Sequence, residues 1–234
     1  KPISLELGGH APVLVFGDAD IESAVKKIVP IKFRTCGQVC ISPTRFFVHR
    51  SVVQKFTDAL VSAAKSLKVG DGVDAATQVG PLVTARRLAS VQAMVADAVK
   101  QGARVATGGE RLGDRGFFFT PTVLQDVPDS ATIMREEPFG PVVPISPFDS
   151  YEEVVRRANG TELGLAAYAF TTSLATAQNV SRDLDCGVVG INTLAVSTVE
   201  APFGGFRNSG HGKEGGTEGI DSFLVSKFIV ESVA

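Results

Sequence analysis

The sequence predicts an α/β domain in which a largely parallel sheet is flanked by helices. Short apolar runs of strand length alternate with longer segments whose apolar residues recur every three to four positions. The chain has 234 residues, of which 44% are hydrophobic, so it can bury a substantial core as one large domain or two small ones. No internal repeat or low-complexity tract interrupts the alternation.

The expected elements follow from these patterns in chain order. A strand needs a short apolar or β-branched run bounded by turn residues, whereas a helix needs periodic apolar positions over several turns. We expect a strand over Ala11–Phe16, a helix over Ile21–Phe33, a strand over Arg45–His49, a helix over about Val52–Leu67, a loop over Gly70–Pro81, a helix over Thr84–Gln101, strands over Ala103–Thr107, Phe117–Leu124 and Val142–Phe148, a helix over Tyr151–Ala158, a strand over Ala166–Phe170, a helix over Leu174–Asp183, and a strand over Val188–Asn192.

Local signals support several boundaries. Gly-Asp-Ala-Asp at residues 17–20 supplies a helix N-cap before Ile21. In the helix over 84–101, Val91 and Val95 share one face, and Gly102 ends the helix.

The end of the chain has a different character. A glycine-rich stretch from Gly204 to Gly219 is followed by a strand-like run, Phe223–Val230. An unpaired strand edge is a liability, so this run is either an edge strand of the same domain or pairs with another segment or subunit. The pattern alone leaves both interpretations open.

Composition narrows the functional classes. No apolar run approaches the roughly 20 residues needed to span a bilayer, and the N-terminus is not typical of a secretory signal. The net charge of −2 with no basic stripe argues against nucleic-acid binding. Three cysteines without a Cys-x-x-Cys pair, and three scattered histidines, make a zinc site or disulfide framework unexpected and favour a reducing cytoplasm.

Two windows contain residues suited to covalent chemistry. Cys40 lies in the loop between a predicted helix and a predicted strand, a common place for a reactive group, although a lone loop cysteine is more often structural. The preceding helix end carries negative dipole charge, so any lowering of the thiol pKa must come from elsewhere. Glu6 lies between two leucines and directly before Gly8-Gly9, where an apolar setting raises the pKa of a carboxyl toward that of a general base. A water-facing carboxylate above a turn is the simpler alternative.

Two further windows are ambiguous when taken singly. Residues 134–141 contain two acids and a Pro-Phe-Gly-Pro turn, which is compatible with a plain surface loop. The glycines of residues 201–210 do not follow the Gly-x-Gly-x-x-Gly spacing of a dinucleotide loop.

Taken together, the four windows resemble the aldehyde dehydrogenase superfamily over the whole chain. Leu5-Glu-Leu-Gly-Gly9 is similar to the general-base motif of that family, and Gly37-Gln-Val-Cys40 to its nucleophile motif. Glu136-Glu-Pro-Phe-Gly-Pro141 resembles the segment that holds the nicotinamide ribose, and Pro202-Phe-Gly-Gly205 the loop along the substrate tunnel. The motifs occur in the family's order, with its 34-residue step from Glu6 to Cys40.

The resemblance implies a role for each matching residue. Cys40 is the nucleophile that attacks an aldehyde, and Glu6 activates the water that hydrolyses the resulting thioester. The cofactor is NAD or NADP. Five further positions follow from the motifs: Glu137 for the nicotinamide ribose hydroxyls, Phe139 for packing on that end of the cofactor, the Leu7 and Gly8 backbone for the nicotinamide, and Phe203 for the tunnel wall.

The resemblance also implies that a longer protein contains separate segments for catalysis, oligomerisation and cofactor binding. Residues 1–221 match the catalytic domain, and residues 222–234 match an oligomerisation strand and tail. The family's cofactor-binding domain is not in this chain, so the chain alone is expected to oxidise aldehydes poorly. The parent protein is expected to be a homodimer or homotetramer, with no nucleic-acid or membrane partner.

The expected substrate is a small-molecule aldehyde that carries a carboxylate. Arg34 and Ser197 resemble positions that hold the substrate carboxylate in succinate-semialdehyde dehydrogenases, and a guanidinium binds a carboxylate bidentately. Succinate, glutarate and 2-oxoglutarate semialdehydes are the candidates, and a surface arginine is the alternative. Cys36 could form a disulfide with Cys40, but two buried inert thiols at Cys36 and Cys186 fit the pattern better.

Two other classes of protein remain as alternatives. A cysteine hydrolase would pair Cys40 with His49 or His10, yet it has no need of the Glu6 and Glu137 motifs. A non-catalytic oligomerising remnant is the other alternative, and the intact Cys40 and Glu6 argue against it. His10 is interpreted as a packing or capping residue.

Overall fold

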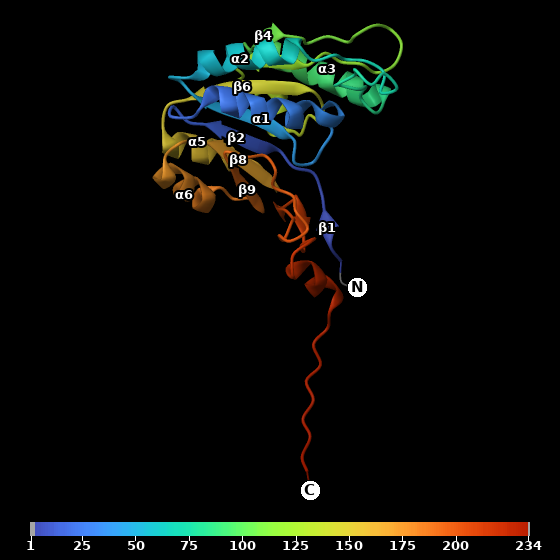
Figure 1. Cartoon of the computed structure of the whole chain (residues 1–234), viewed down its shortest axis with the longest axis vertical. Helices are drawn as coiled ribbons and strands as arrows, with labels where there is room; N and C mark the ends of the chain where they lie inside the picture. Colours follow the sequence, from blue (N-terminus) through green and yellow to red (C-terminus); the bar gives the residue numbers. More distant parts are fainter. Residues whose placement is uncertain (1–2, 234) are drawn as a thin grey trace.

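A computed structural model describes residues 3–233 and confirms the α/β fold. Its central sheet has seven strands in the order β4-β5-β6-β3-β2-β8-β9, all parallel except β4, which pairs antiparallel with β5 (Figure 1). The strands are β2 (Ala11–Val15), β3 (Pro43–His49), β4 (Arg104–Thr107), β5 (Thr122–Gln125), β6 (Val142–Phe148), β8 (Ala166–Phe170) and β9 (Val188–Ile191).

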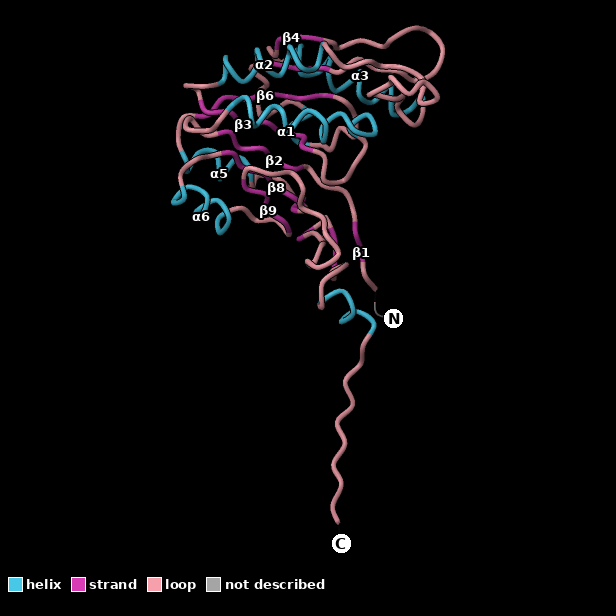
Figure 2. Tube along the Cα trace, in the orientation of Figure 1, coloured by secondary structure: helices cyan, strands magenta, loops and turns pink. Residues whose placement is uncertain are grey.

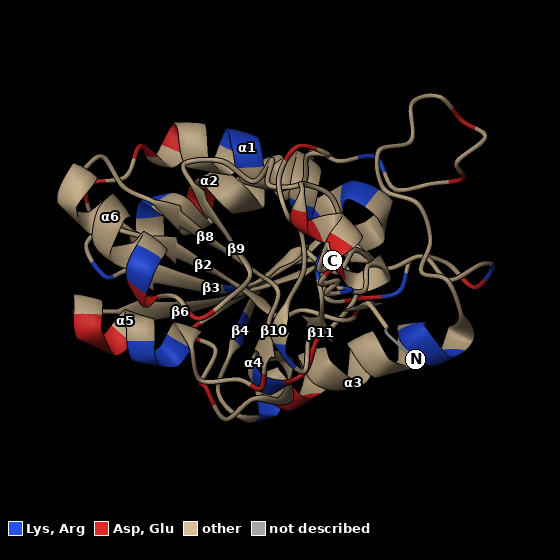
Figure 3. Cartoon of the chain, turned by 90° about the horizontal axis from the view of Figure 1, so that it is seen from below, with Lys and Arg blue, Asp and Glu red and all other residues tan. Residues whose placement is uncertain are grey.

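Helices cover both faces of this sheet. In Figure 3, α1 and α2 lie on one side of the strands and α3 and α5 on the other, with basic (blue) and acidic (red) positions interspersed along the visible helices. The helices are α1 (Ile21–Phe33), α2 (Val53–Lys65), α3 (Ala85–Lys100), α4 (Thr132–Arg135), α5 (Tyr151–Ala158) and α6 (Leu174–Asp183), with the short 3₁₀ helices η1 (Arg34–Gly37) and η2 (Glu218–Phe223). Among the described residues, no helix is long and apolar enough to cross a membrane.

The predicted helix boundaries agree with the structure to within two residues, because their signals are local. The Asp20 side chain accepts from the Ser23 amide and caps α1, and the Thr84 hydroxyl accepts from the Arg87 amide and caps α3. The face of α3 predicted to be buried is buried, and Gly102 follows the helix with a φ of +105°.

The predicted strand over Phe117–Leu124 was wrong in its first half. Only Thr122–Gln125 forms β5. The carbonyls of Phe117 and Phe118 accept from Leu82 and Leu112 in neighbouring loops, and Pro121 has no amide to donate to a ladder. The backbone hydrogen bonds of this segment are therefore used outside the sheet.

The predicted C-terminal strand over Phe223–Val230 is also absent from the described residues. Phe223 ends η2, and residues 224–233 run away from the body of the molecule as an extended segment (Figure 2). No other described segment pairs with it, so its backbone makes no ladder. Its apolar side chains are exposed, with Val225 at 89% and Phe228 at 90%.

The parallel topology determines where the loops before the strands meet. β2 pairs in parallel with both β3 and β8, and β3 pairs in parallel with β6. The amino ends of parallel strands lie at one edge of a sheet. The segments that precede β2, β3 and β6 therefore converge at the same edge, and these segments contain Glu6, Cys40 and Glu137.

Four two-residue strands continue this edge. β1 (Leu5–Glu6) pairs antiparallel with β11 (Gly210–His211), and β10 (Phe206–Arg207) pairs antiparallel with β7 (Leu163–Gly164). These pairs bring the C-terminal part of the chain against the segment that carries Glu6.

Candidate active site

The loop that carries Cys40 begins with a sharp change of backbone direction after α1. Thr35, Cys36 and Gly37 have φ values of +52°, +58° and +72°. Left-handed backbone costs a non-glycine residue about 1–2 kcal/mol, and the cost is unusual for a β-branched residue such as Thr35. This strained turn directs Cys36 into the core and leaves Cys40 half-buried.

Side-chain and glycine contacts hold the strained loop in place. The Gln38 side chain donates to the Thr35 carbonyl and accepts from the Val83 amide, at 3.0 and 2.9 Å. A Cβ at Gly37 would collide with the Gly140 carbonyl, and a Cβ at Gly9 would lie 2.6 Å from the Cys40 carbonyl oxygen. Both glycines therefore permit backbone contacts that no other residue allows.

Glu6 and Cys40 face each other across this loop. Burial and the neighbouring Glu6 carboxylate raise the pKa of the Cys40 thiol to about 11, against hydrogen bonds from the backbone amides of Ile41 and Cys40 that lower it. Burial likewise raises the pKa of Glu6, which the interaction with Cys40 lowers and the Glu214 carboxylate raises. A carboxyl group and a thiol thus share one partly buried site.

Glu137 lies on the opposite side of the glycine pair. Its Oε1 accepts from the Gly9 amide at 3.3 Å, and a Cβ at Gly8 would lie 2.6 Å from its Oε2. Burial raises the pKa of Glu137 to about 7, while the Gly9 hydrogen bond and the Arg87 guanidinium lower it. The missing side chain of Gly8 therefore leaves room for this carboxylate beside the Glu6 strand.

Phe139 continues the same side of the site. Its φ is +45°, and the Arg87 guanidinium lies 5.9 Å from the centre of its ring. Phe139, Arg87 and Ser90 line one surface cavity, together with Val83, Thr84 and Arg86. Arg87 and Ser90 are thus beside the predicted cofactor end, although no role was predicted for either residue.

The structure separates the two predicted carboxylate anchors. Ser197 lines a cavity with Phe203 and Glu214, and Glu214 acts electrostatically on Glu6. Arg34 instead lines an apolar cavity between the ends of α1 and α2. Within the described residues these two cavities are distinct, so this chain does not place Arg34 and Ser197 in one binding pocket.

Three positioning side chains were missed in the sequence. The buried Ser209 hydroxyl donates to the Gly8 carbonyl at 2.7 Å and accepts from the Gly164 amide at 2.9 Å, which ties the Glu6 segment to β7. The Tyr168 hydroxyl donates to the Ile41 carbonyl at 2.7 Å. Lys32 is fully buried beside Cys36 and Glu137, and burial lowers its pKa to about 7.

Only one of these three left a signal in the sequence. Lys32 falls on the apolar stripe formed by Val25, Ile28 and Val29 of α1, where a lysine is out of place. Tyr168 and Ser209 depend on contacts across the fold that no local pattern reveals.

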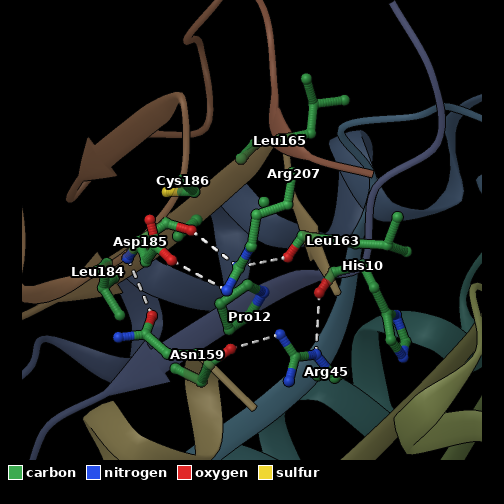
Figure 4. Close-up of a pocket in the computed structure, with 14 residues that line it drawn as sticks. His10, Pro12, Arg45, Asn159, Leu163, Leu165, Leu184, Asp185, Cys186 and Arg207 are labelled. Carbon is green, nitrogen blue, oxygen red and sulfur yellow. Dashed lines mark hydrogen bonds and ion pairs between the residues drawn. The ribbon is translucent and has the colours of Figure 1, made fainter. Parts of the chain in front are cut away.

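A separate cluster of polar side chains lies close to the site but binds its own neighbours (Figure 4). Arg45 donates to the His10 and Ala158 carbonyls, and Arg207 forms an ion pair with Asp185 at 2.9 Å. The cavity between them holds about 10 Å³, roughly the space of one water. His10 also bonds Thr44 through Nδ1 at 2.9 Å, so its expected packing role is confirmed.

The remaining cysteines have inert surroundings. Cys36 is fully buried, and burial raises its thiol pKa to about 12. Cys186 is half-buried, and burial raises its pKa to about 11. Both are free thiols in this structure, and a regulatory Cys36–Cys40 disulfide stays a prediction.

Comparison with known proteins assigns the family. The model of the aldehyde dehydrogenase family matches residues 1–229. The chain is 48% identical to a putative 4-(hydroxymethyl)benzenesulfonate dehydrogenase of Comamonas testosteroni and 43% identical to the NADP-dependent succinate-semialdehyde dehydrogenase of Escherichia coli, each over 98% of this chain and 48% of the relative. The crystal structure of succinate-semialdehyde dehydrogenase from Burkholderia pseudomallei superposes with a TM-score of 0.94 at 44% identity, over 96% of this chain and 47% of that one.

An α/β sheet with a cysteine and a carboxylate at its amino edge defines a domain of the aldehyde dehydrogenase type. The chain belongs to the aldehyde dehydrogenase family. It spans about half the length of the curated relatives it matches.

Proposed function

We propose that this chain is the catalytic domain of an NAD- or NADP-dependent aldehyde dehydrogenase, working in the cytoplasm, with Cys40 as nucleophile and Glu6 as general base. The observation that carries the proposal is the meeting of the Glu6 carboxyl with the Cys40 thiol at the convergence of four family motifs. Residues 1–221 form this domain, and residues 222–234 form an oligomerisation strand and tail that completes a homodimer or homotetramer.

The chemistry follows from the positions of these two side chains. Cys40 gives up its proton and its sulfur forms a bond to the aldehyde carbon, which leaves a negative oxygen stabilised by backbone amides. When bound, the cofactor accepts the hydride that leaves this carbon, and a thioester on Cys40 remains. Glu6 then takes a proton from water, the resulting hydroxide adds to the thioester, and the acid leaves as the Cys40 thiolate is restored.

The residues expected to hold the cofactor fit a flat, hydroxyl-bearing ligand. Glu137 presents a buried carboxylate beside Gly8, whose missing side chain leaves the Leu7–Gly8 backbone open to close approach. Phe139 supplies an apolar surface on the same side. We infer that the rest of the cofactor site lies in the half of the relatives that this chain does not match.

The raised pKa of Cys40 supports a further part of the proposal. A thiol with a pKa near 11 is almost entirely protonated at neutral pH, and the thiolate is the nucleophile. Together with the incomplete cofactor site, this leads us to propose that this chain alone does not oxidise aldehydes at a useful rate. Steady NAD(P)H formation by the purified chain would contradict this.

The substrate proposed is an aldehyde that carries an anionic group, first of all a carboxylate as in succinate or glutarate semialdehyde. The exposed Arg34 guanidinium lies six residues before Cys40 and within electrostatic reach of Tyr168, which also senses Cys40. Phe203 and Ser197 line the separate cavity that also contains Glu214. A sulfonate is the second candidate, because the relative at 48% identity is named for a benzenesulfonate. Both groups accept hydrogen bonds from a guanidinium.

A chimaera tests the proposal directly. In it, this chain replaces the matching half of the Escherichia coli relative, and NADPH formation is followed with succinate semialdehyde. We expect activity that Cys40→Ser abolishes and that Glu6→Gln reduces by about a hundredfold or more, the scale of a lost general base. Full activity in the folded Cys40→Ser chimaera would refute the proposed nucleophile.

The same chimaera tests the anionic substrate. Arg34→Ala should raise KM for succinate semialdehyde by about tenfold or more and leave KM for a neutral aldehyde of similar length unchanged. Arg50→Ala, an exposed arginine at the other edge of the sheet, is the matched control. An equal rise for both aldehydes would show that Arg34 does not bind the substrate anion.

Within the described residues, neither candidate histidine supports the cysteine hydrolase alternative. His49 ends β3 and bonds Ser51 through Nδ1, about 20 Å of strand away from the Cys40 end. His10 is buried with its Nδ1 on Thr44.

A further inference from the structure

Tyr168 is a buried phenol that touches the loop of the nucleophile. It lies on β8, and its hydroxyl donates to the Ile41 carbonyl at 2.7 Å. The ring is fixed by its neighbours in the sheet, because Tyr168 pairs with Val13 of β2 and Gly190 of β9. A Cβ at Gly190 would lie 3.0 Å from the ring. The hydroxyl is therefore held in one place.

The Ile41 carbonyl depends on this hydroxyl. Ile41 is buried, and the turn around it is closed by a hydrogen bond from the Ser42 amide to the Val39 carbonyl at 2.9 Å. Pro43, which starts β3, has no amide to donate. Tyr168 is thus the donor that the described residues supply to the Ile41 carbonyl, and removal of its hydroxyl leaves a buried acceptor unpaired.

The amide of Ile41, in the peptide unit that precedes this carbonyl, matters for the nucleophile. Hydrogen bonds from the Ile41 and Cys40 amides to the sulfur hold down the pKa of the Cys40 thiol, against burial and the Glu6 carboxylate. Glu6 from β1 and Tyr168 from β8 are the titratable groups that the described residues set against this thiol. Burial, and to a smaller extent Cys40, raise the pKa of Tyr168 above its usual range, so the phenol stays a donor.

We propose that Tyr168 is a positioning residue for the nucleophile, whose hydroxyl fixes the Ile41–Ser42 peptide unit and so restrains the Ile41 backbone with its amide directed at the Cys40 sulfur. The proposal rests on the proposed function only in taking Cys40 as the nucleophile. The Cys40 carbonyl, which shares a peptide unit with the Ile41 amide, is confined against Gly9, so the peptide units on both sides of Ile41 have fixed orientations.

The chain offers a matched pair of variants, because it has two tyrosines. Tyr168→Phe removes the hydroxyl beside the Cys40 loop. Tyr151→Phe removes a hydroxyl that donates to Asp183, also at 2.7 Å, on a different part of the domain. The measurement is the rate of Cys40 alkylation by iodoacetamide over about pH 8–12, a range that includes the raised thiol pKa of about 11, by peptide mapping. Buried Cys36 serves as the internal reference.

We expect Tyr168→Phe to slow Cys40 alkylation by about three- to tenfold, the scale of one weakened hydrogen bond to a thiolate, and to move its pH midpoint upward. Tyr151→Phe should stay within about twofold of the unaltered chain, since it alters no group near the sulfur. Equal rates and midpoints for the two variants would overturn the proposal. A Cys40 in the unaltered chain that is less reactive than Cys36 at every pH would instead count against Cys40 as nucleophile.

A second measurement needs no altered Tyr168. With tyrosine labelled by ¹³C at Cζ, the Tyr168 signal should shift as Cys40 titrates, and the shift should be absent in Cys40→Ser. The Tyr151 signal, assigned from Tyr151→Phe, should not move at that midpoint. A Tyr168 signal that ignores Cys40 overturns the proposal even if Tyr168→Phe fails to fold.

Discussion

The two edges of the parallel sheet differ in how their polar groups are satisfied. At the carboxyl edge, the Asp18 carboxylate accepts from the Thr171 and Thr172 hydroxyls and from two backbone amides at the start of α6, all at 2.8–2.9 Å. At the amino edge, Glu6 Oε1, Lys32 Nζ and Ser42 Oγ are buried without a hydrogen-bond partner among the described residues. The polar groups named at the carboxyl edge are satisfied within the domain, whereas those named at the amino edge are left unpaired, as in a ligand-binding or catalytic site.

The unpaired buried groups at the amino edge reduce the stability of the chain there. Open parallel sheets usually bind ligands at the carboxyl ends of their strands, yet Glu6, Cys40 and Glu137 all lie before their strands. The amino edge holds the left-handed Thr35, Cys36 and Phe139 and most of the unpaired buried groups, whereas the carboxyl edge holds two left-handed residues, Asp126 and Asn192. Functional sites often carry such strain, which the rest of the structure must offset.

The largest effect on stability is expected from Gly37→Ala. The alanine would have to adopt a φ of +72° and displace the Gly140 carbonyl, so the free energy of unfolding should fall by about 3–5 kcal/mol. Gly113→Ala is the matched control, because Gly113 has a φ of +67° with open space around it, and should cost only about 1–2 kcal/mol. Urea unfolding measures both, and equal losses would show that the contact with Gly140 is not tight.

Lys32→Met should stabilise the chain, by roughly 2 kcal/mol at neutral pH, since it removes a buried ammonium that has no partner among the described residues. Burial lowers the pKa of Lys32 from 10.5 to about 7, so between these values the unfolded chain binds the extra proton. Stability of the unaltered chain should therefore rise with pH across this window.

The test of this is a series of thermal melts from pH 6 to about 10.5, the window set by the two pKa values. Lys32→Met should flatten the rise, and the exposed Lys26→Met on the same helix should not. A destabilised Lys32→Met with an unchanged pH profile would mean that Lys32 is paired in solution.

At the carboxyl edge, Asp18→Asn should cost about 1 kcal/mol, because the amide replaces a carboxylate that accepts several hydrogen bonds while solvent screens its charge. These bonds hold the pKa of Asp18 below its usual 3.8, although burial opposes them. The contribution is thus complete at neutral pH and is lost as pH falls through the folded pKa, below about 4.

Asp20→Asn provides the control for Asp18, since asparagine caps helices about as well as aspartate. Acid unfolding followed by circular dichroism should show less pH dependence below about pH 4 for Asp18→Asn only. The same acid transition in both variants would show that the hydrogen bonds of Asp18 do not stabilise the carboxyl edge.

The two edges were not equally visible in the sequence. Helix α1 was predicted to the residue because Asp20 and the apolar period are local signals. Cys40, Glu6 and Glu137 were found through the order of four motifs, and the parallel topology brings their segments together. The contacts of Tyr168 and Ser209 are made across 127 and 45 residues of sequence, so no window around either residue contains its partner.

The C-terminal tail could not be predicted correctly from its sequence pattern. Its alternation predicted a strand, but strand structure needs a partner, and residues 224–233 have none among the described residues. Periodicity indicates that a segment is suited to pairing and does not supply the segment it pairs with.

Removal of residues 224–234 should have the smallest effect on folding. The exposed tail makes no ladder with the body of the molecule, so the free energy of unfolding should change by less than about 0.5 kcal/mol. Self-association should weaken, because Val225, Phe228 and Val230 offer exposed apolar side chains along an unpaired backbone. Sedimentation velocity over a concentration series measures the self-association, with Phe228→Ser as a milder variant. Unchanged association would show that the tail does not pair with a second copy. A large loss of stability on urea unfolding would show instead that the tail packs on its own domain.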